Sequence, residues 1–362
     1  MDNILQTPET SIEELIEVLS NENFISSLSK RQVIDLAKLC DNVYEEEEID
    51  IGKIALEQVT KLKESILRTR KNEEKGNFFT KMSNLFSEKD RKQTLSIENL
   101  THDLNVLEHE ISILKNNSVR NMVELLKDNE TFSSYRVLGY SLRNDDQLSS
   151  IFIYDQLKNH MVIVFKGTKS VRDWSINIDW DIKNSSELLG ETPFKLHGGF
   201  QNTFIERIDH FDTSFNEILK LYQEELQKCK LHVTVTGHSL GGALSTIAAC
   251  YIKKKHNNII SSVNNITFAS PKVFTDASVD TVENFLGKTN ILRIWNQLDP
   301  VPLLPTSGKE NGQAITYKHV GHDIMYKDNE FTFPHAMSRY IELTNQKYPT
   351  LKSLKEELAK KE

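Results

Sequence analysis

Hydrophobic and polar positions divide the chain into two parts with different periods. Up to about residue 130, apolar residues recur at spacings of three and four, which predicts amphipathic helices rather than strands. The longest such run is Ile97, Leu100, Leu104, Leu107, Ile111 and Leu114. Ser11 and Glu14 form a capping-box pattern ahead of another apolar face that begins at Ile12. The first part of the chain is therefore predicted to be helical.

Beyond Thr131, short β-branched and aromatic runs alternate with helical stretches. Residues 150–154 and 161–165 flank the turn-like residues 158–160 and predict a hairpin. Further strands are predicted at 232–236, 265–269, 290–296 and 314–320, and helices at 243–254 and 336–345. This alternation is typical of an α/β domain with a mostly parallel central sheet. The predicted fold class is therefore α/β, with an added helical N-terminal region.

Composition narrows the class of protein further. The chain has 362 residues, which suits one large core with a helical addition because single cores stop growing near ~250–300 residues. Its 38% hydrophobic and 27% charged residues are typical of a globular protein rather than a disordered one. The formal net charge of −8 argues against nucleic acid as a partner.

Targeting and metal-binding signals are weak. The first twenty residues lack a basic region followed by an apolar run, and the longest apolar stretches fall short of the ~20 residues that cross a bilayer. Cys40, Cys229 and Cys250 have no metal-ligand spacing. We therefore expect a cytoplasmic protein with reduced thiols, no metal and no cofactor, although export without a cleaved signal would give the same pattern.

The sharpest motif is Gly237-His238-Ser239-Leu240-Gly241, which follows the β-rich residues 233–236 and precedes a helix. A turn tight enough to expose a serine hydroxyl above a sheet needs small neighbours, which explains the glycines. Ser239 is the predicted nucleophile of an α/β-hydrolase core, and the Leu240 amide is a predicted oxyanion donor. In the alternative interpretation the glycines only let strand and helix pack closely.

A serine needs a histidine to take its proton and a carboxylate to orient that histidine. Asp299 fits the expected order because it follows the strand-like residues 291–296 and precedes a Pro-Val-Pro turn. The alternative for Asp299 is an ordinary Asp-Pro turn. Asp276 and Asp280 lie near a predicted helix start and are interpreted as capping residues.

Three histidines follow Asp299 in the sequence. His335 is the favoured base because it leads into the last predicted helix, where α/β-hydrolases place this residue. His322 is the second candidate, and His319 lies within a predicted strand. Whichever histidines are not used are interpreted as structural.

Two stretches compete to supply a second oxyanion donor. Thr168 follows the predicted strand at 161–165, so that its amide and hydroxyl can point into the site. The His-Gly-Gly-Phe sequence at 197–200 is the alternative, but it follows no convincing strand and is interpreted as structural.

Six fragments together resemble the class 3 lipase family, and they occur in the family's order at 162–168, 171–174, 197–200, 236–242, 267–273 and 299–302. The resemblance implies an α/β-hydrolase fold. It also implies the roles of five residues: Ser239 as nucleophile, Asp299 as orienting acid, His335 as base, and Thr168 with Leu240 as the oxyanion hole. Lys166 stands where arginine is commoner in the family, which is tolerable if this side chain only forms pairs on the surface.

The resemblance also bears on the organisation of the chain. It implies a lid within residues 170–196, although the alternation around Trp174 equally predicts a half-buried strand. Residues 30–45 resemble the family's opening helix. The predicted divisions are an N-terminal helical segment at 1–29, the opening helix at 30–45, a helical insertion at 46–128, the lipase core at 129–345 and a charged tail at 346–362.

The predicted function is a serine hydrolase of lipid carboxylic esters, either a tri- or diacylglycerol lipase or a phospholipase A, which acts through an acyl-enzyme. Its expected partners are a lipid ester and, transiently, a membrane or lipid-droplet surface. Two alternatives remain. One is a catalytically silent lipase-fold protein whose helical region binds a partner, and the other is an esterase or thioesterase for small soluble substrates.

Overall fold

The computed structural model describes residues 10–44, 102, 105–106, 108–168, 182–184, 186–189, 194–223, 230–310 and 313–358. Residues 46–101 of the predicted insertion lie outside this range, as do Cys229 and Trp174 with most of the stretch considered as a lid. Of the amphipathic helix predicted over 97–114, residues 102, 105–106 and 108–113 are described and helical, and residue 114 lies in a turn.

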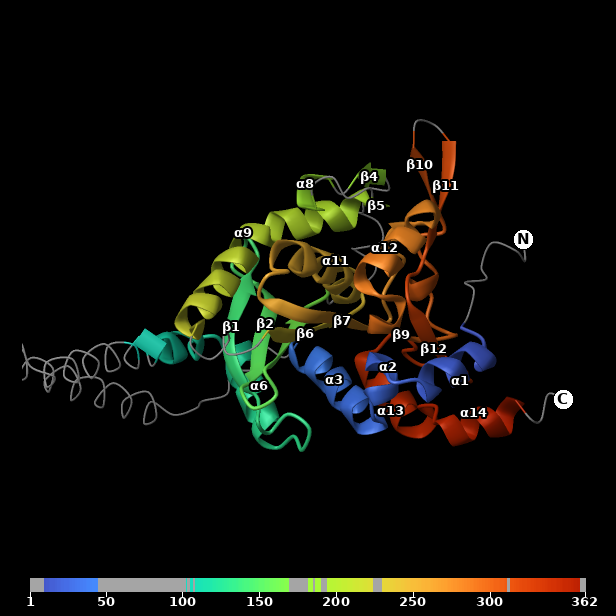
Figure 1. The fold of residues 1–362 in the computed structure, drawn as a ribbon, viewed down its shortest axis with the longest axis horizontal. Helices are drawn as coiled ribbons and strands as arrows, with labels where there is room; N and C mark the ends of the chain where they lie inside the picture. The colour runs from blue at the N-terminus through green and yellow to red at the C-terminus, as the bar shows by residue number, and fades with distance from the viewer. Residues whose placement is uncertain are drawn as a thin grey trace, which may run out of the picture.

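A seven-stranded sheet forms the centre of the fold (Figure 1). Its spatial order is β1 (Arg136–Leu142), β2 (Leu148–Asp155), β3 (His160–Phe165), β6 (Leu231–His238), β7 (Ile260–Phe268), β9 (Ile291–Asn296) and β12 (His322–Tyr326). The pairings from β3 to β12 are parallel, whereas β1–β2 and β2–β3 are antiparallel. The predicted α/β fold, its mostly parallel sheet and the 150–165 hairpin are confirmed.

Helices cover both faces of this sheet (Figure 1). One face carries α9 (Gly198–Leu221), α11 (Leu240–Lys255) and α12 (Val279–Leu286). The other carries α3 (Lys30–Asn42), α6 (Asn117–Lys127) and α13 (Met337–Lys347). The strands read as continuous apolar runs because both of their faces are buried.

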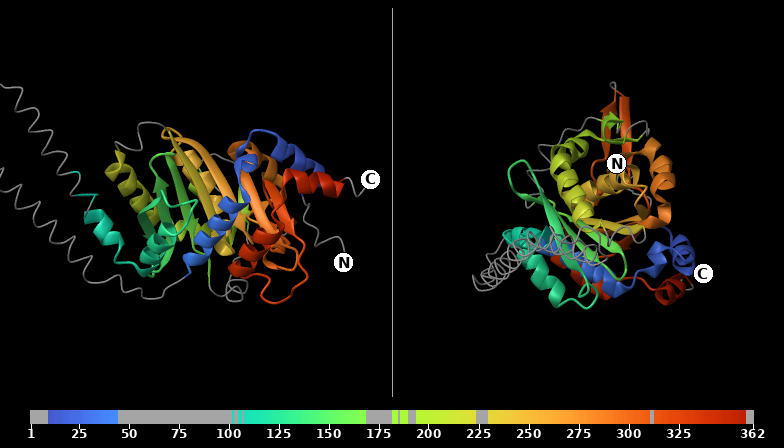
Figure 2. Two further views of the ribbon diagram at one scale, coloured as in Figure 1. Left: turned by 90° about the horizontal axis from the view of Figure 1, so that it is seen from below. Right: turned by 60° about the vertical axis from the view of Figure 1, so that its left-hand side comes forward.

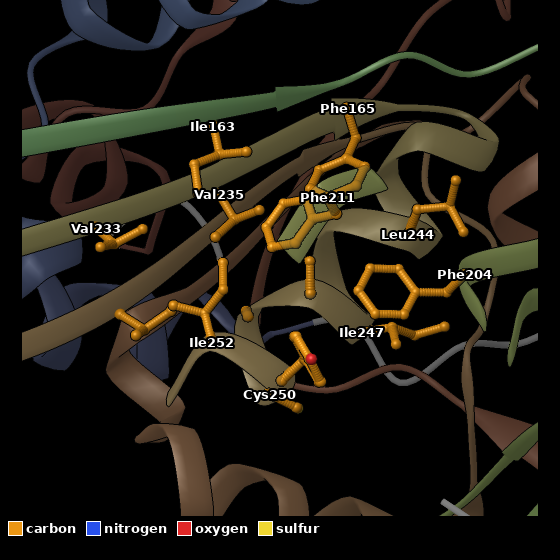
Figure 3. Packing of buried hydrophobic residues seen from close by; sticks show 14 of the residues in the cluster. Ile163, Phe165, Phe204, Phe211, Val233, Val235, Leu244, Ile247, Cys250 and Ile252 are labelled. Carbon is orange, nitrogen blue, oxygen red and sulfur yellow. The ribbon is translucent and has the colours of Figure 1, made fainter. Parts of the chain in front are cut away.

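Alternate residues of one strand therefore enter two different cores. In β3, Ile163 and Phe165 face the α11 side, where they pack near Phe211 and Leu244 (Figure 3). Residues 162 and 164 of the same strand face the α3 side. This period of two is the geometry of a β-strand, and it lets the sheet pack against the N-terminal helices on one face and the later helices on the other.

The two ends of the described chain meet at one edge of the molecule. The helices α1 (Ile12–Ser20) and α14 (Leu351–Leu358) lie side by side, next to the short α2 (Phe24–Ser27), as Figure 2 shows. The helix α14 lies in the stretch interpreted as a charged tail. Its start is capped by Thr350, whose Oγ1 accepts the Ser353 amide at 3.1 Å, and its Leu354 is buried.

A second sheet of five short strands lies beside the main one. Its order is β10 (Ser307–Glu310), β11 (Gln313–Lys318), β8 (Phe274–Thr275), β5 (Lys195–His197) and β4 (Ile182–Asn184), and a four-residue helix, α8 (Ser186–Leu189), follows β4. The strand predicted at 314–320 belongs to this small sheet. The main sheet ends instead on β12, which the sequence analysis did not predict because the polar pair His322-Asp323 interrupts its apolar pattern.

Asp323 can occupy a buried strand because its carboxylate is fully bonded. It accepts the indole N–H of Trp295 at 2.6 Å and both the amide and the hydroxyl of Thr10, at 2.8 and 2.7 Å. The guanidinium of Arg293 lies 3.5 Å away. Buried charges are tolerated when they are paired and hydrogen-bonded in this way.

His160 gives the fold a dependence on pH. Its Nδ1 lies 2.6 Å from the Tyr135 hydroxyl and its Nε2 lies 2.8 Å from the Thr234 hydroxyl, and burial lowers its pKa from 6.5 to about 4. Below pH 6.5 the unfolded chain therefore binds a proton that the folded chain does not. The free energy of unfolding is expected to fall by about 2 kcal/mol between pH 7 and pH 5 through His160 alone.

Urea unfolding at several pH values measures this change. His160→Gln, which does not titrate, is expected to lose that part of the pH dependence. An equal slope for the variant and the wild-type protein between pH 7 and pH 5 would contradict the assignment to His160.

Candidate active site

Four parallel strands end at the same edge of the main sheet. Thr168 follows β3, Ser239 follows β6, Asp299 follows β9, and the loop after β12 leads to His335. Because the strands run in the same direction, these residues are brought together from distant points of the sequence. The crevice at the carboxyl edge of such a sheet is the usual place for a site.

Ser239 occupies a strained turn between β6 and α11. Its φ of 58° and ψ of −128° lie in a region that side chains rarely adopt. The turn is held because the Ser239 amide donates to the Phe268 carbonyl at 3.0 Å. A Cβ atom on Gly237 would collide with the carbonyl of Gly241, and one on Gly241 would collide with the carbonyl of Phe165. The glycines are therefore needed for close approach of the backbone.

A continuous chain of hydrogen bonds links Ser239, His335 and Asp299. Nε2 of His335 lies 2.9 Å from the Ser239 hydroxyl, and Nδ1 lies 2.8 Å from Oδ2 of Asp299. An ionised carboxylate can only accept, so Nδ1 carries the proton and Nε2 is free to accept from the serine. This is the arrangement that lets a histidine take a proton from a serine.

Asp299 is fully buried and has a partner on each oxygen. Oδ1 accepts the Val301 amide at 3.0 Å, and Oδ2 accepts the Tyr340 hydroxyl at 2.7 Å in addition to His335. The Tyr340 hydroxyl itself accepts the amide of Asn296 at 3.0 Å, so its one proton is directed at the carboxylate. The sequence analysis did not single out Tyr340, since an apolar position in a helix carries no local sign of this role.

The other predicted candidates lie elsewhere. Nδ1 of His322 lies 3.3 Å from a carboxylate oxygen of Glu14, and Nε2 of His319 lies 2.7 Å from the carbonyl of Pro302. Asp276 pairs with Lys318 at 2.7 Å, and Asp280 lies in the first turn of α12. In the described part of the chain, neither histidine is hydrogen-bonded to Ser239.

Glu14 corrects one local prediction. Its amide donates to Ser11 at 3.1 Å, so Ser11 does cap α1. Its carboxylate instead forms an ion pair with Lys288, which is distant in the sequence but only 2.7 Å away. In the described part of the chain, the Glu14 carboxylate does not accept the Ser11 amide, as a capping box requires, because it pairs with Lys288.

The predicted oxyanion donors lie on both sides of the Ser239 turn. Leu240 is the first residue of α11, so its amide is among those with no partner within the helix. The Oγ1 atom of Thr168 is buried and has no hydrogen-bond partner in the described part of the chain. A buried hydroxyl without a partner costs free energy, which makes it a candidate to bind a ligand oxygen.

Lys166 differs from its predicted environment. It is only 7% exposed, so it is not the surface cation that the sequence analysis considered. The His-Gly-Gly-Phe stretch differs from the expectation that it follows no strand. His197 ends a short strand, β5, and its ring packs against Tyr317 in the small sheet.

His238 and Tyr44 complete the surroundings of the site. Nε2 of His238 lies 2.9 Å from the carbonyl oxygen of His335 and therefore donates to it, while Nδ1 faces the Tyr44 hydroxyl at 3.4 Å. Burial, together with the neighbouring His335, holds the pKa of His238 well below its usual range. His238 is thus a neutral residue that fixes the backbone of His335. Tyr44 packs on Gly167, next to Thr168.

Comparison with known proteins bears on the family that this chain resembles. Residues 162–309 match a family model described as Lipase (class 3). The predicted resemblance to class 3 lipases is confirmed over this stretch. It contains Thr168, Ser239, Leu240 and Asp299 but not His335, whose assignment rests on its hydrogen bonds.

Proteins with lipase and phospholipase names are similar to this chain. "Phospholipase A1-II 3" of Oryza sativa subsp. japonica is 28% identical over 177 residues, which cover 41% of this chain and 40% of the relative. "Secreted mono- and diacylglycerol lipase 1" of Fusarium solani is 28% identical over 169 residues, which cover 47% and 46%. The chain thus spans less than half the length of these two relatives.

Solved structures of lipases are similar as well. A triacylglyceride lipase of Rhizomucor miehei has a TM-score of 0.43 and 23% identity over 56% of this chain and 70% of its own. The fold assignment rests on the strand order given above. Within the described residues, no group of three or more histidine, cysteine or acidic side chains could hold a metal ion, and no helix is long and apolar enough to cross a membrane.

The strain at Ser239 predicts an unusual order of stability. Ser239→Gly is expected to be more stable than Ser239→Ala. Its free energy of unfolding should be about 1 kcal/mol higher, because glycine accepts a φ of 58° without steric cost. Chemical denaturation measures the difference. At Ser245, inside α11, the order is expected to reverse, since glycine is the poorer residue within a helix. A more stable alanine variant at position 239 would show that the turn is not strained.

Proposed function

We propose that this chain is a serine hydrolase of lipid carboxylic esters. The observation that carries the proposal is the hydrogen-bonded series Ser239–His335–Asp299. The buried Thr168 hydroxyl, which has no hydrogen-bond partner within the described residues, adds to it. A buried and fully bonded carboxylate, a correctly oriented histidine and a strained serine together serve acyl transfer and have no evident structural use.

The proposed reaction has two halves. The Ser239 hydroxyl oxygen attacks the ester carbonyl carbon while His335 Nε2 takes the hydroxyl proton. The oxyanion accepts hydrogen bonds from the Leu240 amide and Thr168, and its collapse expels the alcohol, which receives the proton from His335. Water then attacks the carbonyl carbon of the acyl-enzyme and gives a proton to His335. Collapse of this second intermediate releases the fatty acid, and His335 returns the proton to the Ser239 oxygen. Asp299 keeps its negative charge throughout and stabilises the imidazolium.

Support for lipid esters as the substrate class comes from the relatives, whose names include phospholipase A1 and mono- and diacylglycerol lipase. An esterase for small soluble substrates would share the same catalytic residues. Comparing the products released from triacylglycerol, diacylglycerol, phospholipid and a short soluble ester distinguishes these possibilities. The cytoplasmic location stays a prediction, since relatives carry the words "secreted" and "chloroplastic" in their names.

The proposed organisation keeps residues 30–45 with the lipase core and treats 46–128 as an insertion. Contacts of the described helices support this division. The helices α3 and α6 contact each other, α3 also packs on β6, and α6 packs on β1. The insertion would therefore leave and rejoin the core at neighbouring points, with α6 as its anchored end.

Covalent labelling tests the nucleophile. The wild-type protein is expected to bind about one fluorophosphonate per chain, and Ser239→Ala none, because the probe needs an activated serine. Ser245→Ala is a matched control, since Ser245 is a buried serine of the same helix outside the hydrogen-bonded series. Intact mass spectrometry measures the adduct. A folded wild-type protein that takes up no label would support the catalytically silent alternative.

A pair of tyrosine variants tests the role proposed for Asp299. Tyr340→Phe removes one donor from this carboxylate and is expected to lower kcat on a soluble ester by about tenfold, with a loss of about 1–2 kcal/mol in stability. Tyr326→Phe is matched to it, because Tyr326 is also buried and its hydroxyl donates to Thr344 at 3.0 Å. It is expected to lose similar stability and keep its kcat. Equal kcat for the two variants would show that Tyr340 has only a structural role.

A further inference from the structure

Large hydrophobic side chains in the described part of the chain are almost all buried or half-buried. The exceptions there are Leu157, which is 93% exposed, Phe331, which is 78% exposed, and Phe333, which is 77% exposed. Single exposed apolar residues such as Leu157 are common on protein surfaces. Two phenylalanines separated by one residue, with only Pro334 between the second and His335, form a pair that needs an explanation.

The loop that carries this pair is fixed at its first end. The carboxylate of Asp328 accepts Nε of Arg339 at 2.9 Å and Nδ2 of Asn296 at 3.0 Å. Its backbone carbonyl accepts Nε2 of Gln297 at 2.6 Å. The hydrogen bonds from Arg339, with those from two backbone amides, hold the pKa of Asp328 well below its usual range, so the anchor is charged at all ordinary pH values.

The second end of the loop is fixed by the site itself. The carbonyl of Pro334 accepts Nδ2 of Asn296 at 3.3 Å, and the carbonyl of His335 accepts from His238. Phe333 has a φ of 50°, and its carbonyl accepts the Ala336 amide at 2.9 Å in a tight turn. The two exposed rings therefore belong to a loop that hydrogen bonds anchor at both ends.

We propose that Phe331 and Phe333 insert into the apolar layer of a lipid surface and place the opening of the site against it. This inference rests on the proposed function, since lipid esters are presented at such surfaces. Phenyl rings have no polar group to satisfy, so hydrocarbon takes them up without loss of hydrogen bonds. The pair adjoins the histidine that contacts Ser239, so docking would bring ester groups to the nucleophile.

The charges of the chain favour a neutral surface. Residues 328–335 contain no lysine or arginine, and the Glu330 carboxylate in this loop pairs with Arg339 at 2.9 Å. The whole chain has a formal net charge of −8. Binding through this loop is therefore driven by burial of apolar surface rather than by attraction to anionic lipids.

Vesicle sedimentation tests the proposal without turnover. In a Ser239→Ala background, the protein is expected to bind phosphatidylcholine vesicles, and adding Phe331→Ser with Phe333→Ser is expected to weaken binding by at least about tenfold. Binding of the Ser239→Ala protein is expected to persist at high salt. Leu157→Ser is the matched control. Leu157 precedes β3, whereas Ser239 follows β6, and these two strands are parallel. Leu157 therefore lies at the opposite edge of the sheet from Ser239.

A second measurement locates the rings. Phe331→Trp is expected to retain binding and to lose fluorescence to brominated lipid, whereas Leu157→Trp is not quenched beyond the background of the native tryptophans. The proposal is overturned if the double serine variant binds as well as its parent, if Leu157→Ser loses as much, or if binding requires anionic lipid and disappears in salt. Because Ser239→Ala is used throughout, these outcomes are separate from failure of the fluorophosphonate test.

Discussion

The strained turn at Ser239 is the constraint on which the rest of the site depends. Its φ of 58° points the hydroxyl out of the sheet, and the backbone bond to Phe268 keeps it there. The turn is possible only because the backbone of Gly241 packs directly against that of the strand end at Phe165. Gly167, which precedes Thr168, also packs closely on the backbone of His238 and Gly241. These close backbone approaches therefore bring the proposed nucleophile and the segment that carries a proposed oxyanion donor together.

Two neighbouring histidines have different tasks because their surroundings differ. The rings of His238 and His335 are 4.6 Å apart, yet His238 is buried and donates to a carbonyl while His335 lies between a hydroxyl and a carboxylate. A second positive charge so close would be costly, so a neutral His238 is compatible with the proposal that His335 takes the proton of Ser239. Tyr44, at the end of α3, contacts His238, and Cys40 of α3 lies 3.4 Å from Thr236. The opening helix is therefore bound to the site although a long stretch separates the two in sequence.

The sequence predicted what local chemistry determines. Each of these features can be recognised from a few neighbouring residues. They are the glycines around Ser239, the Asp-Pro turn at Asp299 and the position of His335 before a helix. Structural features that depend on partners distant in the sequence could not be predicted in this way. The polar start of β12 is acceptable only because Trp295 and Thr10 bind Asp323, and Tyr340 is an ordinary helix residue until Asp299 lies beside it. Glu14 illustrates the same point, since a tertiary ion pair with Lys288 replaced its expected local bond.

The loop from Asp328 to His335 links the surface of the molecule to its chemistry. Ser239 is only 1% exposed and the His335 side chain 19%, whereas the rings that precede His335 are more than three-quarters exposed. Asn296 bonds both ends of this loop, to Asp328 and to Pro334, and its own amide donates to Tyr340. A force on the exposed rings would thus be resisted by the residues that orient Asp299 and His335. If the proposed surface contact occurs, we therefore expect the hydrogen bond between His335 and Ser239 to persist.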